Sequence, residues 1–215
     1  MIWFTGDTHL GHANIIKYCR RPRTKTAEIE GRDRTVPDVK AHDAALVGNW
    51  NSKVAPDDEV WHLGDFAWWH LPDEEIRALY DSLNGYKHLI IGNHDCGPDG
   101  EPVPILRELF GDRLHRYIEI KIGGDGRRKP LSHSGGQKLV LFHYAMRGWV
   151  HDYHNPDKGK KGSWHLYGHH HGRLMSHRTS FDVGVDVCNY SPISWPDVEQ
   201  KMLAILAASH RGDPI

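Results

Sequence analysis

Five short runs of apolar, β-branched and aromatic residues in this chain end in the same kinds of polar residue. Each run has the length and composition of a β-strand and is bounded by glycine or polar residues. The polar residues that follow are Gly6-Asp7-Thr8-His9, Gly64-Asp65, Gly92-Asn93-His94-Asp95, His143 and Gly168-His169-His170-His171. Helical patterns alternate with the strands, which favours an α/β fold. Ligands of open α/β sheets bind beyond the carboxyl ends of strands, so we expect the five segments to share one site.

The α/β pattern extends along the whole chain. Strands are expected at 2–5, 59–63, 88–91, 115–122, 138–142, 164–167 and 181–187, and helices at 12–19, 37–52, 72–83, 104–110 and 194–208. Segments 20–36, 123–136 and 151–163 are expected to be loops, the second of them closing a long hairpin. No internal repeat and no interdomain linker is visible, so residues 1–215 are expected to form a single domain.

Composition narrows the range of partners. Lys+Arg is 27 and Asp+Glu is 28, and the net charge of −1 gives no global field for nucleic acid or membrane. Cys19, Cys96 and Cys188 form no C-x-x-C pair, so neither a disulfide framework nor a thiolate zinc site is expected. The N-terminal residues show no cleavable apolar segment, and the apolar run at 202–208 is too short to span a bilayer. We therefore expect a cytoplasmic protein without membrane contact; its oligomeric state stays open.

Histidine is in excess, at 18 residues, and metal binding is the first explanation to test. In an extended segment, residues i and i+2 point to the same side, so Asp7 with His9 could hold one ion together. His169 and His171 have the same spacing, while His170 would project the other way. A single strand-end histidine such as His143 is more often a core residue than a ligand. The ordered combination of all five segments is what favours a metal site.

The five segments resemble, in this order, the calcineurin-like metallophosphoesterase superfamily, in its small single-domain bacterial or phage type. The pattern of that superfamily is D-x-H, G-D, G-N-H-D/E, a single H and G-H-x-H, and here it extends from residue 7 to residue 171. The resemblance implies a four-layer α/β-β/α sandwich of two mixed sheets flanked by helices. It also implies a dinuclear metal site at the strand ends.

The resemblance assigns two sets of metal ligands. One ion would be held by Asp7, His9, Asp65 and His171, and the other by Asp65, Asn93, His143 and His169. Asp65 would bridge the two ions. These nitrogen and oxygen ligands favour Mn²⁺, with Fe, Zn²⁺, Co²⁺ or Mg²⁺ as alternatives. His94 would be the general acid, and Asp95 beside it would either support His94 or form a turn.

The implied activity is hydrolysis of a phosphate ester, with a hydroxide between the metals as the nucleophile. A nucleotide-like diester is favoured by the basic segments Arg20–Arg23, Arg127–Lys129 and Lys158–Lys161. The alternatives left open are a phosphomonoesterase, a nuclease on polymeric nucleic acid and a non-catalytic metal-binding scaffold. The near-zero net charge argues against the nuclease, and the presence of His94 argues against the scaffold.

One departure from the phosphoprotein-phosphatase branch is informative. That branch carries a second aspartate in G-D-x-x-D, where this chain has Trp68, which argues against a Ser/Thr protein phosphatase. His12 and Arg147 are candidates for substrate binding. Tyr144 and Trp149 are candidates for stacking on a base.

The remaining histidines are given ordinary roles. His62 and His165 are expected in the core or behind the ligands. Six others are expected at the surface: His42, His88, His115, His133, His177 and His210.

Overall fold

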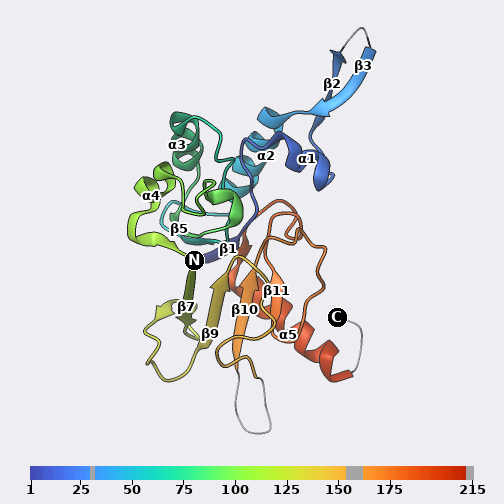
Figure 1. Cartoon of the computed structure of the whole chain (residues 1–215). Helices are drawn as coiled ribbons and strands as arrows, with labels where there is room; N and C mark the ends of the chain where they lie inside the picture. The colour runs from blue at the N-terminus through green and yellow to red at the C-terminus, as the bar shows by residue number, and fades with distance from the viewer. Residues whose placement is uncertain (30–31, 154–161, 212–215) are drawn as a thin grey trace.

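The computed structural model describes residues 1–29, 32–153 and 162–211 and has an α/β fold with mixed sheets. The strands of these residues form two five-stranded sheets and a separate two-stranded hairpin. Figure 1 shows the first sheet in the upper part of the molecule and the second sheet below it. The basic segment 154–161, which includes Lys158–Lys161, lies outside the described residues.

The first sheet has four parallel strands and one antiparallel edge strand. Its order is β12 (Ile193–Ser194), β1 (Ile2–Thr5), β4 (Glu59–His62), β5 (Tyr86–Ile90) and β6 (Leu114–His115). Strands β1, β4, β5 and β6 are parallel, and β12 is antiparallel to β1. Parallel strands end at the same edge of a sheet, so the polar residues after β1, β4 and β5 are brought together.

The second sheet is also mixed. Its order is β11 (Ser180–Asp182), β10 (Ser163–Tyr167), β9 (Gln137–Phe142), β7 (Tyr117–Ile122) and β8 (Arg128–Lys129). Strands β9, β10 and β11 are parallel, while β7 is antiparallel to both β9 and β8. All five residues of β10 are buried, as expected of a strand covered on both faces.

The two sheets pack face to face around one apolar core. Residues of β1, β4 and β5, such as Phe4, Trp61 and Ile90, lie in one cluster with residues of the second sheet, such as Leu141 and Leu166. A second cluster covers the other face of the first sheet. It combines side chains of that sheet with those of α2 (Val39–Asn51), α3 (Asp73–Ser82) and α4 (Pro104–Phe110).

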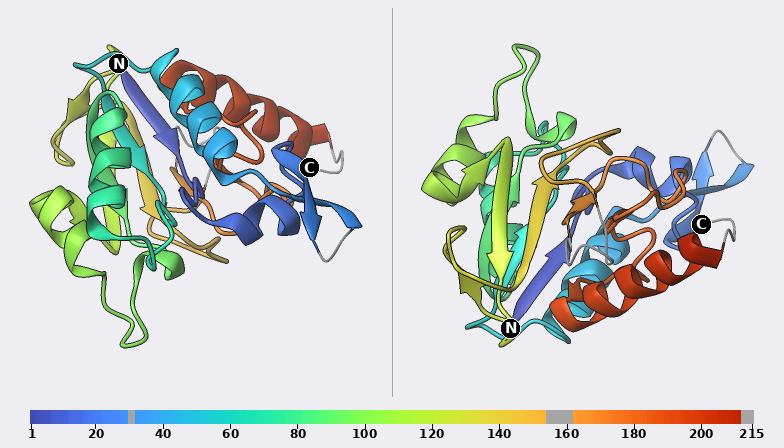
Figure 2. Two further views of the ribbon diagram at one scale, coloured as in Figure 1. Left: turned by 90° about the horizontal axis from the view of Figure 1, so that it is seen from above. Right: turned by 90° about the horizontal axis from the view of Figure 1, so that it is seen from below.

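A helical layer on the outer face of each sheet was expected, and this is met for the first sheet only. Helix α5 (Trp195–Arg211) contributes Val198, Met202 and Ile205 to the core between the sheets, instead of covering the second sheet from outside. Figure 2 shows α5 on the opposite side of the molecule from α3 and α4. Ser194 Oγ accepts a hydrogen bond from the backbone N–H of Asp197, which confirms the expected start of this helix.

Most of the expected elements are confirmed within a few residues of their ends. Segment 115–122 is an exception, because β6 pairs in the first sheet and β7 in the second. Segment 181–187 is another, because the strand ends at Asp182 and the chain turns through Gly184. Segment 20–36 is not a loop: it contains the hairpin of β2 (Thr24–Ile29) and β3 (Arg32–Pro37), next to the short helix α1 (Ala13–Tyr18).

The described helices are short or polar. None of them combines the length and the mean hydropathy that a membrane crossing requires.

Candidate metal centre

The structure brings the polar residues at the strand ends together at one edge of the two sheets. The first sheet supplies Asp7, His9, Asp65 and Asn93, and the second supplies His143, His169 and His171. Asp7, Asp65, His9 and His143 are buried. The candidate site therefore lies between the two sheets and belongs to both.

Five of these residues have a left-handed backbone. The φ angles are 55° for Asp7, 48° for His9, 58° for Asp65, 66° for His169 and 49° for His171. The expectation that Asp7–His9 and His169–His171 are extended segments is therefore wrong, although these residues do meet at one site. A residue other than glycine adopts the left-handed conformation at an energetic cost, and such residues are concentrated at functional sites.

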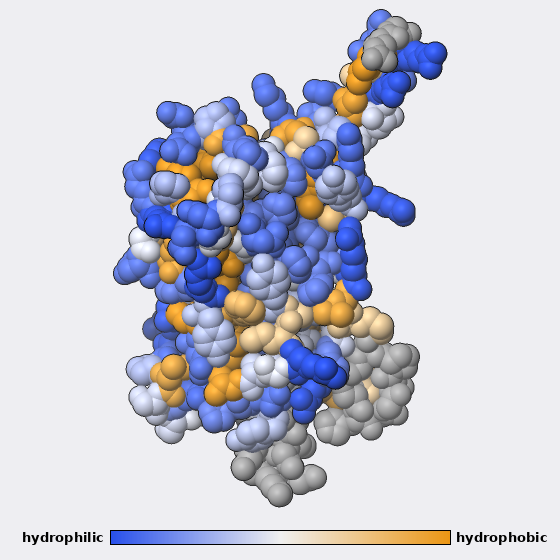
Figure 3. Space-filling view, in the orientation of Figure 1, coloured by the Kyte–Doolittle hydropathy of each residue, from blue (hydrophilic) through white to orange (hydrophobic). Residues whose placement is uncertain are grey.

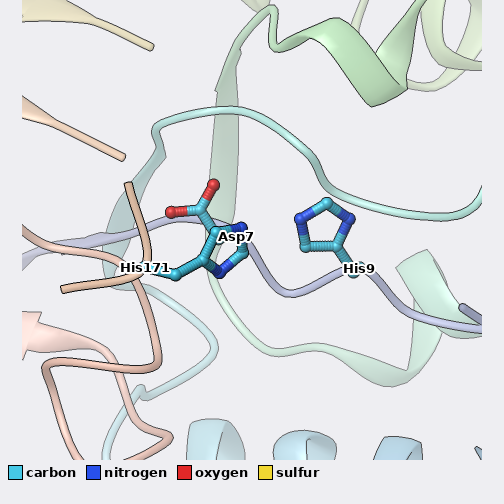
Figure 4. Close-up of side chains that lie close together, drawn as sticks. All are labelled: Asp7, His9 and His171. Carbon is cyan, nitrogen blue, oxygen red and sulfur yellow. The ribbon is translucent and has the colours of Figure 1, made fainter. Parts of the chain in front are cut away.

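Among the described residues, four groups of three possible ligand atoms lie close together, and two of them concern the expected ligand sets. In one group, an atom from each of Asp7, His9 and His171 lies within 4.8 Å of the other two (Figure 4). The second group is formed in the same way by Asp65, His143 and His169. Each of these two groups contains three of the four residues of one expected ligand set, and His169 and His171 lie in different groups. The other two groups are His9 with Asp65 and His94, and Cys19 with His171 and Asp186, so the four groups share residues.

Asp65 lies between the two groups. Its Oδ2 is 3.4 Å from His9 Nε2 and 3.5 Å from His143 Nε2. Burial alone would raise the pKa of this carboxyl, but the rings of His143 and His9 outweigh it and hold the pKa below its ordinary value. The backbone N–H of His94 also donates to Asp65 Oδ1, at 2.7 Å. Asp65 is in the position that a bridging ligand would need.

His9 carries the clearest sign of a missing partner. The residue is 1% exposed, and neither of its ring nitrogens has a hydrogen-bond partner among the described residues. Burial lowers the pKa of this ring well below its usual value. A buried polar group without a partner is costly, and a cation facing the ring would satisfy it.

His143 is arranged in a similar way. Its Nδ1 lies 2.7 Å from the backbone oxygen of Leu63, which can only accept, so Nδ1 carries the proton. In the neutral ring, the lone pair of Nε2 then faces Asn93 Oδ1 at 3.2 Å and Asp65 Oδ2. Burial would lower the pKa of His143, but Asp65 outweighs it and raises the pKa to about 9. Without a cation, Nε2 can therefore be protonated and donate to Asp65, whereas in the neutral ring three lone-pair atoms converge here, as in a cation site.

Asp7 completes the first group. Its carboxylate accepts the backbone N–H of His169 at 2.9 and 3.0 Å. Burial raises the pKa of this carboxyl to about 7. The residues present therefore fit divalent ions, because they combine buried carboxylates with unpaired imidazole nitrogens.

Two glycines of the motifs are required by close approach. A Cβ at Gly64, whose φ is +98°, would lie 2.3 Å from His143 Nδ1. A Cβ at Gly92 would lie 2.3 Å from Asp65 Oδ1. Any side chain at these positions would displace a ligand of the site.

Two residues behind the site were not expected there: Asp186 was missed from the sequence, and Arg21 was counted in the basic segment Arg20–Arg23 that favoured a nucleotide-like substrate. Asp186 Oδ2 lies 2.6 Å from His171 Nδ1, so His171 turns its Nε2 away from Asp186. Arg21 is 2% exposed and donates to both carboxylate oxygens of Asp186, at 2.9 and 2.7 Å. It also donates to the backbone oxygens of Asp7 and Thr8. Burial would lower the pKa of His171, but Asp186 outweighs it and raises the pKa to about 10.

His94 lies at the open side of the cluster, among aromatic rings. Its ring is 4.9 Å from that of His9, 5.5 Å from that of His12 and 5.8 Å from that of Trp68. His12 stacks on Trp68, with ring centroids 4.0 Å apart and an interplanar angle of 2°. Burial lowers the pKa of His12 to about 4, so this ring is neutral. The structure therefore brings His12 into the site, with Trp68 behind it.

Asp95 does not partner His94. Its two carboxylate oxygens accept the backbone N–H groups of Asp65, Phe66 and Gly92, at 2.8 to 2.9 Å. The residue is fully buried and joins the loops after β4 and β5. Of the two roles expected for Asp95, the structure favours the structural one.

Of the two aromatic residues expected to stack on a base, Tyr144 lies beside the cluster and Trp149 does not. Tyr144 is 37% exposed and its ring is 4.6 Å from that of His169, at the rim of the cluster. Trp149 instead packs on His165, at 5.2 Å, and donates to the backbone oxygen of Ser163. Arg147 is exposed and has no hydrogen bond or ion pair within the described ranges.

Two histidines expected at the surface are buried. His42 is 2% exposed and its Nε2 lies 3.0 Å from Arg21 Nη1. His88 is 7% exposed and stacks on Trp61. His62 and His165, which were expected in the core, are 1% and 0% exposed.

The chain is similar to several proteins whose names give no activity. The chain is 30% identical, over 203 residues, to the uncharacterized protein MJ1445 of Methanocaldococcus jannaschii, covering 90% of this chain and 86% of that protein. It is 29% identical to the gene 66 protein of Mycobacterium phage D29, covering 86% and 87%. A protein of unknown function from Aquifex aeolicus, AQ665, has a similar fold, with a TM-score of 0.58 at 21% identity over 93% of this chain and 98% of that one. No protein-family model matches the chain.

Proposed function

We propose that this chain, which belongs to the same family as MJ1445, is a metal-dependent phosphoesterase that hydrolyses a phosphodiester of the nucleotide type. The proposal includes membership of the calcineurin-like metallophosphoesterase superfamily, as the order of the motifs implies. The observation that carries it is the position of Asp65 Oδ2 between His9 and His143, at 3.4 and 3.5 Å, where the two ligand groups meet.

The proposed ligands are the two expected sets. Asp7, His9, Asp65 and His171 would hold one divalent ion, and Asp65, Asn93, His143 and His169 the other. The unpartnered ring nitrogens of His9 and the orientation of His143 Nε2 support this assignment. The ions, Mn²⁺ in the first instance, would lower the pKa of water for attack on phosphorus and offset charge on the phosphoryl oxygens.

His94 is the proposed general acid. Its backbone N–H is held by Asp65, which fixes the residue beside the cluster. Its side chain is half-buried and lies on the open side, where a leaving group can reach it. Protonation of the leaving oxygen by a positioned histidine would prevent the build-up of negative charge on that oxygen.

The charges around the cluster favour a diester over a monoester. Within the described ranges, Arg21 is the only lysine or arginine with a hydrogen bond to a ligand residue, and its guanidinium is engaged by Asp186 and two backbone oxygens. His12 is neutral and can donate a hydrogen bond without adding charge. A monoanionic diester therefore suits this site better than a dianionic monoester.

The test is hydrolysis of matched chromogenic esters by the Mn²⁺-loaded protein. We expect turnover of bis(p-nitrophenyl) phosphate, and slower turnover of p-nitrophenyl phosphate. His94→Gln should abolish turnover while bound metal stays at the wild-type level. His133→Gln is the matched control, because His133 is exposed between β8 and β9, at the opposite end of β9 from His143. Metal binding without turnover of either ester would favour the scaffold alternative.

A further inference from the structure

The β2–β3 hairpin projects from the body of the molecule as a separate arm (Figure 1). Of its described residues, only Ala27, Val36 and Pro37 are partly buried, and the others are exposed. The arm has no third strand, and an isolated two-stranded ribbon is only marginally stable in water. The arm is therefore a candidate surface for contact with another molecule.

The two faces of the arm differ in charge. The strands are antiparallel, with Lys25 opposite Val36, Ala27 opposite Arg34 and Ile29 opposite Arg32. Alternate residues of a strand share a face, so one face, here called the basic face, presents Lys25, Ala27, Ile29, Arg32, Arg34 and Val36. The opposite, acidic face presents Glu28 and Asp33 with Thr24, Thr26 and Thr35. Every basic residue of the two strands is on one face, and every acidic residue on the other.

The two arginines of the basic face, Arg32 and Arg34, have no ion-pair partner in the part of the chain that the structure describes. Lys25 is 3.9 Å from Asp38, at an exposed position where such a pair is weak. Arg32 and Arg34 follow each other at every second position, about 6.6 Å apart along the strand. Figure 3 shows the hydrophilic side chains of the arm standing clear of the body.

The base of the arm is anchored to the candidate metal centre. Arg21, three positions before the first strand of the arm, binds the backbone oxygens of Asp7 and Thr8 and the carboxylate of Asp186. The backbone N–H of Asp38, after the second strand, donates to the backbone oxygen of Arg23. The arm is therefore closed at its base and fixed to the loop that carries Asp7 and His9.

We infer that the basic face of the arm binds the phosphate backbone of double-stranded DNA, so that the phosphodiester cleaved at the metal centre belongs to a polymer. The inference rests on the proposed function and narrows its substrate. A two-stranded ribbon fits the major groove of B-form DNA, whereas the major groove of A-form RNA is too narrow. Arginine pairs with phosphate through two parallel N–H groups, so Arg32 and Arg34 provide the main contacts.

The experiment compares charge-removing variants of the two faces in the full-length protein. Arg32→Gln/Arg34→Gln removes two charges from the basic face, and Glu28→Gln/Asp33→Asn removes two from the acidic face. Binding of a labelled DNA duplex is measured at several salt concentrations without added metal. We expect the first variant to lower the dependence of log affinity on log salt by about two and to weaken binding at least tenfold. The second variant should keep the wild-type slope.

Hydrolysis of the small diester is measured in the same proteins and should be unchanged in both variants, because among the described residues no hydrogen bond or ion pair joins the substituted side chains to a ligand residue. Loss of duplex cleavage in the first variant, with small-diester turnover retained, supports the inference. A wild-type salt slope in Arg32→Gln/Arg34→Gln overturns it. So does a wild-type protein that binds no duplex but forms a dimer that this variant dissociates, since the arm would then bind a second copy of the chain. Absence of small-diester hydrolysis would refute the proposed function alone, because duplex binding is measured separately.

Discussion

At the scale of single residues, His169, His170 and His171 are neighbours in sequence with different surroundings. His169 belongs to the group with Asp65, and His171 to the group with Asp7, while the ring of His170 contacts Tyr167 and His169 at its edge. We expect His169→Ala and His171→Ala each to weaken binding of one metal ion at least tenfold. His170→Ala is the control and should retain the wild-type metal content, measured by elemental analysis after dialysis. Equal losses in all three variants would contradict the assignment.

Asp186 provides a second prediction. It orients His171 and is itself held by Arg21, an arrangement that fixes the ring and raises its basicity. Asp186→Asn should lower metal affinity roughly 10–100-fold, because the neutral amide lacks the negative charge that raises the basicity of His171. Asp152→Asn is the control, since Asp152 is paired only with Arg178 away from the cluster. Titration with Mn²⁺ would measure both, and unchanged affinity in Asp186→Asn would show that Asp186 has no positioning role.

His165 makes stability depend on pH. Its Nδ1 donates to the backbone oxygen of Val140, and its Nε2 accepts the backbone N–H of Met146. Burial lowers the pKa of this ring from 6.5 to about 4, so the unfolded chain binds the proton more tightly than the folded one. The free energy of unfolding therefore decreases as pH falls from 6.5 towards 4. The expected decrease between about pH 7.5 and pH 5.5 is roughly 1.4 kcal/mol.

The measurement for His165 is chemical denaturation at the two pH values. His165→Gln should reduce the loss of stability on acidification by that amount, because the other buried histidines contribute equally to both proteins. A variant with the same pH dependence as the wild type would show that His165 is not responsible.

The polar residues that meet at the strand ends could be predicted from the sequence, and the residues that hold them could not. Asp7, Asp65 and His171 stand in short local motifs that directly follow strands. Arg21 and Asp186 contact each other across 165 positions of the chain, and neither stands in a recognisable pattern. Asp95 was ambiguous because its role depends on three backbone N–H groups, which carry no sequence signal. Local patterns identify chemistry better than they identify its support.

At the scale of elements, helix α2 contains an avoidable weakness. Gly48 lies in the interior of α2, is exposed, and a Cβ there would contact nothing within 4 Å. Gly48→Ala should therefore stabilise the protein by roughly 0.5–1 kcal/mol, because glycine loses more backbone entropy in a helix. Denaturation by urea measures this, and turnover should not change. A destabilised variant would mean that α2 is not helical at this position.

Elements were predicted well where one face is buried and poorly where it is not. Strand β1 has the expected bounds because its buried residues alternate with a partly buried one in a typical strand composition. Strands β2 and β3 are exposed on both faces, so no apolar alternation marks them. The division of segment 115–122 between two sheets also has no local signal, since β6 and β7 differ only in their distant partners.

At the scale of the whole molecule, the candidate metal centre joins the two sheets. Ligands that come from both should couple metal binding to folding. Metal at about 100 times its dissociation constant should add roughly 2.7 kcal/mol, or a rise in Tm of about 5–10 °C for a chain of this size. Thermal unfolding with Mn²⁺ and after chelation measures the shift. His94→Gln should show the same shift in Tm. An equal Tm with Mn²⁺ and after chelation would show that metal ions do not link the sheets.

The overall α/β organisation followed from the sequence, while the arrangement of layers did not. The alternation of strands and helices gave the α/β class, and the two mixed sheets were expected only from the resemblance. The position of α5 in the core between them depends on how Val198, Met202 and Ile205 pack against residues far away in the chain.

The pairing of the chain's two ends has a consequence for its synthesis. Strand β1 lies between β4 and β12, and Asp7 shares its ligand group with His171. During synthesis, Asp7 and His9 therefore emerge from the ribosome long before His171, which completes their group. The group of Asp7, His9 and His171 is incomplete until His171 has emerged, so a metal ion held by this group would be captured only after the strands that precede His171 have been made.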